Sequence, residues 1–168
     1  MKKSPPLGDF SCDVTFERVR PPKPVTKEES GVTYVVQGDY EIAFQTVLRF
    51  TGGAEFPIKA KLFGELSQKV VVKDDDGKPA YLSGYSQGRS EIVDRNGNVI
   101  FQGRYYDTRT FQSLAGDDAL TPVGKRLCDH WINGFGSGAF AGHAFSLGVH
   151  LTCEGNEPLH GNASGRID

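Results

Sequence analysis

The residues most capable of chemistry lie on a stretch of alternating side chains at positions 99–111. Within this stretch, Asp107 and Arg109 share a face with Phe101 and Tyr105. Successive side chains of a strand point to opposite faces, so this more apolar face is expected to point inward. Charges taken out of water are costly unless they are paired. The pattern therefore indicates a strand that has left the barrel by Asp107, a structural ion pair at the rim, or a site that moves a proton and stabilises negative charge.

His143 is the second candidate for proton transfer. It lies on the stretch 139–152, on an apolar face that also carries Phe145. The pKa of imidazole is close to neutrality, which lets histidine act as a general acid or base. A single histidine among apolar neighbours is more often a hydrogen-bonded core residue, and the sequence leaves both roles open.

The stretch 80–94 has two faces, either of which could point inward. One face carries Tyr85, Arg89 and Glu91, and the other consists mainly of glycine and serine. Small residues inside would leave room for a ligand, whereas a shift of one residue in register reverses the assignment. The residues expected to line a substrate-binding cavity are Tyr85, Phe101, Tyr105 and Phe145.

The spacing of histidines and acids predicts neither a metal ion nor a cofactor. A metal-binding barrel of the cupin type needs a His-x-His pair on one strand face, whereas His143 and His150 are an odd number of residues apart and face opposite sides. The acidic run at 74–77 begins like a calcium loop but lacks its continuation, so it is typical of a solvated turn. The chain also lacks a G-x-S-x-G elbow and a P-loop.

The elements that must position these residues are predicted to be strands of a single domain. The chain has 168 residues, with 21 Gly, 9 Pro, 11 Phe and 6 Tyr against one Met, a mixture that favours short-turn β-structure over helices. Alternation is clearest at 40–50, and Asn96-Gly97 is a hairpin signal. Strands are expected at 10–19, 32–37, 40–50, 58–73, 80–94, 99–111, 139–152 and 159–167.

These strands are predicted to form an all-β fold, a single antiparallel closed barrel of about eight strands with at most one short helix. Successive hairpins usually remove their free edges by closing into a barrel; a β-sandwich is the alternative. A bend is expected at Gly64 and a helical turn at 121–131, while 1–9 and 20–31 are expected to be flexible.

Charge and hydropathy exclude several classes of partner. The net charge is -2 with no long basic block, so no nucleic-acid partner is expected. The first residues lack the apolar core of a signal peptide, and no run approaches the ~18 apolar residues of a membrane span. Three cysteines without a CxxC pair indicate reduced thiols. We therefore expect a cytoplasmic protein without a membrane partner, and a homo-oligomer is left open.

Two glycine-rich segments resemble a known barrel superfamily. Residues 134–142, Gly-Phe-Gly-Ser-Gly-Ala-Phe-Ala-Gly, resemble the G-x-G-x-F-x-G strand entry of the allene oxide cyclase and dirigent-like barrels, and residues 161–167 are similar to their closing strand. The resemblance implies a closed barrel, acting either as a cofactor-free cyclase or in orienting reactive intermediates. It transfers no site residue to this chain.

The function expected from these features is binding of a small apolar or aromatic molecule inside the barrel. Such a site could catalyse a cofactor-independent isomerisation or cyclisation, with Asp107 or His143 handling a proton and Arg109 stabilising negative charge. Two alternatives stay open: a non-catalytic carrier of a hydrophobic ligand, and a filled structural or oligomerisation barrel.

Overall fold

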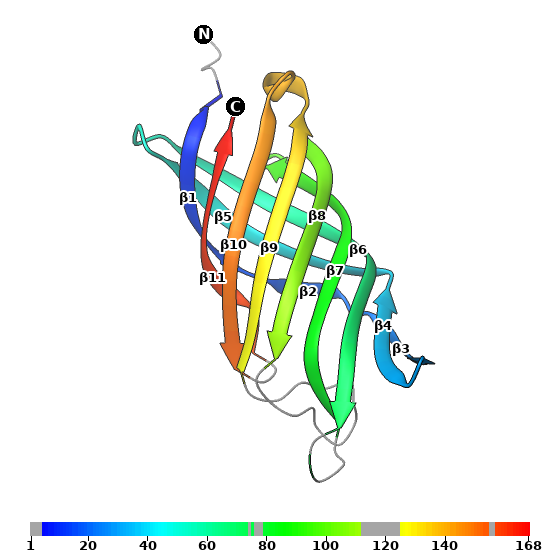
Figure 1. Cartoon of the computed structure of the whole chain (residues 1–168). Coiled ribbons are helices and arrows are strands. Elements are labelled where there is room, and N and C mark those ends of the chain that lie inside the picture. The colour runs from blue at the N-terminus through cyan, green and yellow to red at the C-terminus, as the bar shows by residue number, and fades with distance from the viewer. Residues whose placement is uncertain (1–4, 74, 76–78, 112–124, 155–156) are drawn as a thin grey trace.

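The protein is a single antiparallel β-structure, seen in a computed structural model (Figure 1). The described residues are 5–73, 75, 79–111, 125–154 and 157–168. Their strands are β1 (Gly8–Thr15), β2 (Glu17–Arg20), β3 (Lys23–Glu29), β4 (Val32–Gly38), β5 (Tyr40–Phe50), β6 (Glu55–Lys73), β7 (Pro79–Asp94), β8 (Val99–Phe111), β9 (Lys125–Gly136), β10 (Ala144–Glu154) and β11 (His160–Ile167). A single 3-10 turn, Gly138–Phe140, completes the described elements.

Eight of these strands close into a barrel, as predicted. Around the wall the order is β5-β1-β11-β10-β9-β8-β7-β6, and β6 pairs with β5 to complete the circle. The other three strands extend this wall: β2 pairs with β5, β4 pairs with β6, and β3 pairs with β4. The β3–β4 hairpin stands to one side of the barrel in Figure 1. Closure satisfies the backbone groups that a sheet edge would leave unpaired.

The long strand β6 bends where the sequence predicted a bend, at Gly64. Its pairing with β7 shifts register between Gly64 and Leu66, which is a β-bulge. The ring of Tyr40 covers Gly64, and a Cβ at that position would overlap the ring. The bend lets β6 pair first with β5 and then, beyond Gly64, with β4.

The loop expected within 20–31 and the helical turn expected at 121–131 are corrected by the structure. The segment expected to be a flexible loop contains β3, which pairs in register with β4. Every side chain of β3 is exposed, so no apolar alternation announced the strand. In the predicted helical turn, residues 125–131 belong to β9, whereas 121–124 lie outside the described residues. Cys128 and His130 are buried in β9 and alternate with more exposed neighbours, a period of two that outweighed the capping signal at Thr121.

The barrel interior is apolar at one end and polar further along. At the apolar end, the ring centroids of Phe101 and Phe145 lie 5.3 Å apart, and those of Phe101 and Phe140 lie 4.9 Å apart. Further along the same strands, Asp107 and His130 are completely buried. Charged and polar groups therefore occupy a defined section of an otherwise apolar core.

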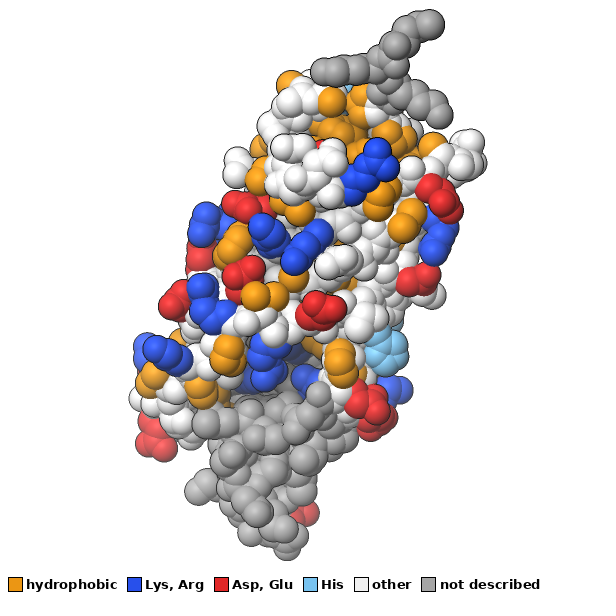
Figure 2. Space-filling model, turned by 180° about the vertical axis from the view of Figure 1, so that it is seen from behind, with side chains coloured by type: hydrophobic (Ala, Val, Ile, Leu, Met, Phe, Trp, Pro, Cys, Tyr) orange, Lys and Arg blue, Asp and Glu red, His pale blue; other side chains and the backbone are white. Residues whose placement is uncertain are grey.

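The face shown in Figure 2 carries charges of both signs: Lys and Arg side chains lie among Asp and Glu, while hydrophobic side chains lie between them and gather toward the upper end of the view. Among the described residues, no helix has the length and apolar character needed to cross a membrane.

Candidate functional site: a polar cluster inside the barrel

Three adjacent strands bring five polar side chains together inside the barrel. In the β8–β9 ladder Asp107 is paired with His130 and Arg109 with Cys128, and in the β7–β8 ladder Ser86 is paired with Asp107. Residues two apart on a strand share a face, so Asp107 and Arg109 of β8 point inward together. Cys128 and His130 of β9 do the same. We call Ser86, Asp107, Arg109, Cys128 and His130 the polar cluster.

An ion pair lies at the centre of the polar cluster. The Nε of Arg109 donates to Oδ1 of Asp107 at 3.0 Å, and its Nη2 donates to Oδ2 at 3.2 Å. The same Nη2 donates to the hydroxyl of Ser86 at 2.9 Å, and that hydroxyl donates to Oδ2 of Asp107. Asp107 is completely buried, whereas 17% of the Arg109 side chain is exposed. The predicted inward placement of Asp107 and Arg109 is confirmed, and their charges compensate each other.

The surroundings determine which members of the polar cluster are charged. Burial alone would raise the pKa of Asp107, but Arg109, with His130 and Ser86, outweighs this effect and lowers the pKa. Burial alone would lower the pKa of Arg109, but Asp107 outweighs it and raises the pKa. Burial lowers the pKa of His130 to about 4. At neutral pH an ionised carboxylate–guanidinium pair therefore lies beside a neutral imidazole.

His130 lacks the hydrogen bonds that a buried histidine usually makes. Its ring stacks on Phe16, with centroids 4.7 Å apart, and lies 6.1 Å from the ring of Tyr105. Its Nε2 is 3.4 Å from Oδ2 of Asp107, longer than a normal N–H···O bond. Among the described residues, neither ring nitrogen has a hydrogen-bond partner. Buried polar atoms without partners are rare in folded proteins, so His130 is an exception that needs a physical reason.

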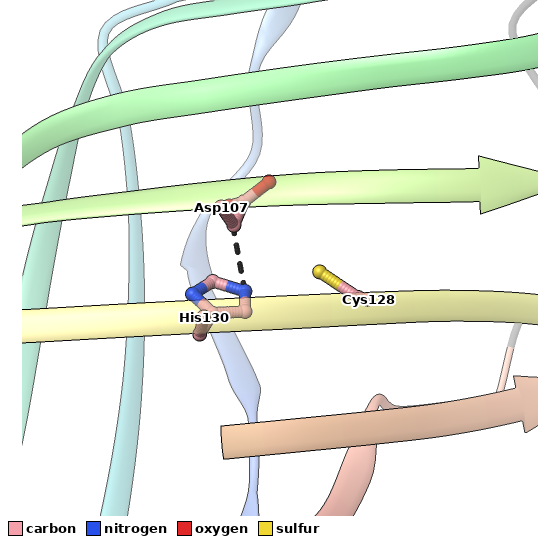
Figure 3. A group of neighbouring side chains, drawn as sticks. All are labelled: Asp107, Cys128 and His130. Atoms are coloured by element: carbon pink, nitrogen blue, oxygen red, sulfur yellow. Dashed lines mark ion pairs between the residues drawn. The ribbon is translucent and has the colours of Figure 1, made fainter. Parts of the chain in front are cut away.

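Cys128 places a thiol beside the acid and the imidazole. Burial raises its pKa to about 12, so the side chain is a thiol and not a thiolate. One ligand atom from each of Asp107, Cys128 and His130 lies within 4.8 Å of the other two (Figure 3). Sulfur, nitrogen and oxygen donors from two adjacent strands thus converge inside the barrel.

Tyr105 and Lys69 border the polar cluster. The hydroxyl groups of Tyr105 and Tyr40 share a hydrogen bond of 2.8 Å, and burial raises the pKa of Tyr105. Lys69 of β6 is also buried, and burial, followed by the nearby charge of Arg109, lowers its pKa to about 7. The section of the interior around the polar cluster is therefore rich in titratable groups.

The predicted cavity-lining residues are divided between the two faces of the wall. Phe101, Tyr105 and Phe145 point inward and are buried, as expected. Tyr85 lies on the outer face, where its ring stacks on Tyr106 at a centroid distance of 6.5 Å, so its placement in the cavity was wrong. The small-residue face of β7 points inward, which answers the question that the sequence left open about this strand.

His143 does not lie in the polar cluster. Strand β10 begins at Ala144, so His143 precedes the strand whose inward face it was expected to share. Its Nδ1 pairs with the backbone carbonyl of Asp168 at 2.6 Å, and its own carbonyl accepts a hydrogen bond from Gly136. Gly136 lies six residues beyond His130 on β9, about 20 Å along the strand at ~3.3 Å per residue. The histidine beside Asp107 is His130, and the signal for it was the inward alternation through Cys128-x-His130.

A hollow on the barrel wall lies apart from the polar cluster. This groove, of about 330 Å³, is lined by the exposed Phe135 together with Arg104, Asn133 and Ser146, whose side chains point outward. Its floor includes Gly103 and Gly134. The lining also includes the buried Phe145, and none of the residues that line the groove belongs to the polar cluster.

Comparison with known proteins finds no matching family model, no matching curated protein and no matching solved structure. The fold and the polar cluster are therefore interpreted from the residues of this chain alone.

Proposed function

We propose that the barrel binds a small, mainly apolar or aromatic molecule that carries one polar group, and that this group is held in the polar cluster. The observation that carries the proposal is His130, which is completely buried without a hydrogen-bond partner among the described residues. A buried polar atom left without a partner costs about 1–3 kcal/mol. A polar group on a bound molecule would remove this cost by pairing with the imidazole.

The aromatic side chains around His130 suit the apolar part of such a molecule. Phe16 stacks on His130 and packs edge-on against Phe44 at 5.2 Å, and the ring of Tyr105 lies 6.1 Å from the imidazole. Aromatic walls with a few placed polar groups are typical of small-molecule sites.

A filled structural barrel is the main alternative and explains the polar cluster less well. Replacing a buried ion pair by apolar side chains of similar volume is often neutral or stabilising. A barrel with a purely structural role would therefore gain little from Asp107 and Arg109, which are buried beside a histidine that has no hydrogen-bond partner among the described residues. The cluster is more readily explained by a ligand.

The proposal is tested with anilinonaphthalene sulfonate, an aromatic probe with one anionic group, added to the full chain in the presence of a chelator. We expect saturable fluorescence with one probe per chain. His130→Phe keeps a ring that can stack on Phe16 but removes both nitrogens, and it should weaken binding about tenfold or more, the effect of a lost hydrogen bond to a charged group.

The matched control is His150→Phe. His150 is exposed and pairs with Asp129 at 2.6 Å on the barrel surface. Its replacement should leave probe affinity unchanged, and circular dichroism should show that both variants keep their β-structure. Absence of saturable binding, or equal affinity for His130→Phe and the unaltered chain, would support the filled barrel.

A proton-transfer activity at the same site is a second proposal. The resemblance of residues 134–142 and 161–167 to the allene oxide cyclase and dirigent-like barrels favours it. In a cofactor-independent isomerisation, a base removes a proton from one carbon and a proton returns to another, while Arg109 stabilises the negative charge that develops between the two steps. His130 takes the role that was expected of His143, because it is the histidine beside Asp107.

Turnover is measured with a β,γ-unsaturated cyclic ketone, whose isomerisation to the conjugated ketone needs only these two proton transfers. Rising ultraviolet absorption that is lost in His130→Phe and kept in His150→Phe would support catalysis. An equal rate in both variants and in buffer would leave the barrel as a carrier.

We further propose a cytoplasmic location, supported by three free, buried cysteines and tested by cell fractionation.

A further inference from the structure

The geometry points to a second use of the same region: we propose that Asp107, Cys128 and His130 bind a divalent transition-metal ion of the zinc class. Each residue offers one ligand atom, and the three atoms lie within 4.8 Å of one another. All three side chains are buried. The proposal goes beyond ligand binding by the barrel, and it has an independent test.

The spacing between the acid and the imidazole fits a shared metal better than a hydrogen bond. Two donors at ~2.1 Å from one tetrahedral metal ion are separated by roughly 3.4 Å. The distance from Nε2 of His130 to Oδ2 of Asp107 is 3.4 Å. This distance is long for a hydrogen bond. A metal ion shared with Asp107 would give a ligand bond to the imidazole, which has no hydrogen-bond partner among the described residues. The sulfur of Cys128 lies within 4.8 Å of both atoms and would have to move closer to complete the set.

The kinds of donor atom select the class of metal. One sulfur, one nitrogen and one oxygen suit Zn²⁺ and its neighbours, whereas Mg²⁺ and Ca²⁺ prefer oxygen ligands. Three protein ligands also leave the fourth tetrahedral position free for water or another small ligand, as in catalytic zinc sites. A search of the sequence for paired histidines misses this set because its ligands are a Cys-x-His pair on β9 and an acid on β8.

Arg109 has two opposing effects on a bound metal. Its guanidinium donates to both Oδ1 and Oδ2 of Asp107 and so orients the carboxylate, as partners of metal ligands commonly do. Its positive charge also opposes a second cation nearby. Binding of the metal converts the Cys128 thiol to a thiolate and releases its proton to solvent, so thiolate and carboxylate supply two negative charges against the three positive charges of the ion and Arg109.

A cysteine–histidine–acid relay fits the arrangement less well. In such a relay the acid contacts one ring nitrogen and the nucleophile contacts the other. Here Nε2 faces Asp107, and the sulfur of Cys128 lies toward the same side of the ring (Figure 3). The carboxylate of Asp107 and the sulfur of Cys128 thus approach the same ring nitrogen, as ligands around a common metal ion do.

The test is a Co²⁺ titration of the full chain after treatment with a chelator. We expect near-ultraviolet absorption from thiolate-to-cobalt charge transfer that saturates at one ion per chain and disappears when Zn²⁺ is added. Cys128→Ser should abolish this absorption. His130→Gln and Asp107→Asn should each weaken binding by about 100-fold, because each removes one of three ligands.

The controls use residues of the same types outside the set. Cys12→Ser replaces another buried cysteine, and His150→Gln replaces an exposed histidine paired with Asp129; both should keep the absorption and its stoichiometry. A charge-transfer band that persists in Cys128→Ser, or cobalt binding without such a band in the unaltered chain, would overturn the proposal.

The titration is performed without the aromatic probe, and the probe experiment is performed with a chelator, so the two proposals can fail separately. If Asp107→Asn does not fold, the comparison of Cys128→Ser with Cys12→Ser decides the outcome alone. A Zn²⁺-dependent rise in melting temperature in the unaltered chain, absent from Cys128→Ser, is the second expected readout.

Discussion

The two ends of the barrel interior are built on the same strands but from opposite kinds of side chain. On β8, Phe101 belongs to an aromatic group with Phe140 and Phe145, whereas Asp107, six residues later, belongs to the polar cluster. Both sections satisfy the same alternation. Alternation therefore determines which side chains point into the barrel. The identity of those side chains determines whether a section of the interior stabilises the fold or forms a candidate site.

The apolar and polar ends of the barrel interior contribute differently to the stability of the fold. Complete burial of a large apolar side chain stabilises the fold by about 1.5–3 kcal/mol. A buried ion pair is seldom more stabilising than apolar residues of the same size, yet it is costly to break. The aromatic end should therefore respond to substitution through packing alone, whereas the polar end should respond in both stability and binding.

The largest effect is expected from Asp107→Asn at the polar end. This change leaves the Arg109 guanidinium buried without its counter-charge, and it should lower the free energy of unfolding by roughly 3–5 kcal/mol. Urea denaturation measures the loss. Asp13→Asn, which removes an exposed pair with Arg49, should cost no more than about 1 kcal/mol. Equal losses in the two variants would contradict the assignment of Asp107 as a buried paired charge.

A cavity at the apolar end should weaken the fold without altering the site. Ile167, which is paired with Phe145 in the β10–β11 ladder, is buried with 1% of its surface exposed, and Ile167→Ala should cost about 2–5 kcal/mol. Binding of cobalt and of the aromatic probe, measured below the melting temperature, should be unchanged. If Ile167→Ala weakened either ligand as strongly as His130→Phe does, the two ends would not be separable.

The Tyr40–Tyr105 hydrogen bond provides a third, smaller test at the border of the polar cluster. Tyr40→Phe leaves the buried hydroxyl of Tyr105 without this partner, so a loss of about 1–3 kcal/mol in urea denaturation is expected. The double variant Tyr40→Phe/Tyr105→Phe should recover much of it, because both hydroxyls are then absent. A double variant with the full sum of the two single losses would show that the hydroxyls do not interact.

The smallest effect is expected outside the barrel interior, at the hairpin between β7 and β8. Hydrogen bonds from Asn98, joined by that of the Asn96 backbone, lower the pKa of Asp94 below its usual value of 3.8. A carboxyl with a lowered folded pKa contributes stability above its unfolded pKa and loses it as the pH falls through the folded pKa. Acid titration followed by NMR should give Asp94 a midpoint below the usual value of 3.8. A midpoint in the ordinary range would contradict the hydrogen bonds of this turn.

Sequence patterns predicted much of the fold because the alternation is local. The strand 99–111 and the inward placement of Asp107 and Arg109 follow from it, and the structure confirms both. The strand Lys23–Glu29 could not be predicted in this way, since every one of its side chains is exposed. His130 was missed because a capping signal upstream suggested a helix, although its own neighbours alternate.

By itself, the sequence determined an all-β chain and the inward faces of several of its strands, since those properties depend on residues within one strand. The tertiary structure decided which strands lie side by side and in what register. Only the β8–β9 pairing brings Asp107 to His130 and Cys128, while His143 lies at a distant turn. Register depends on long-range pairing and bulges, and a shift of one residue would reverse every inward face, so the cluster exists only in the closed barrel.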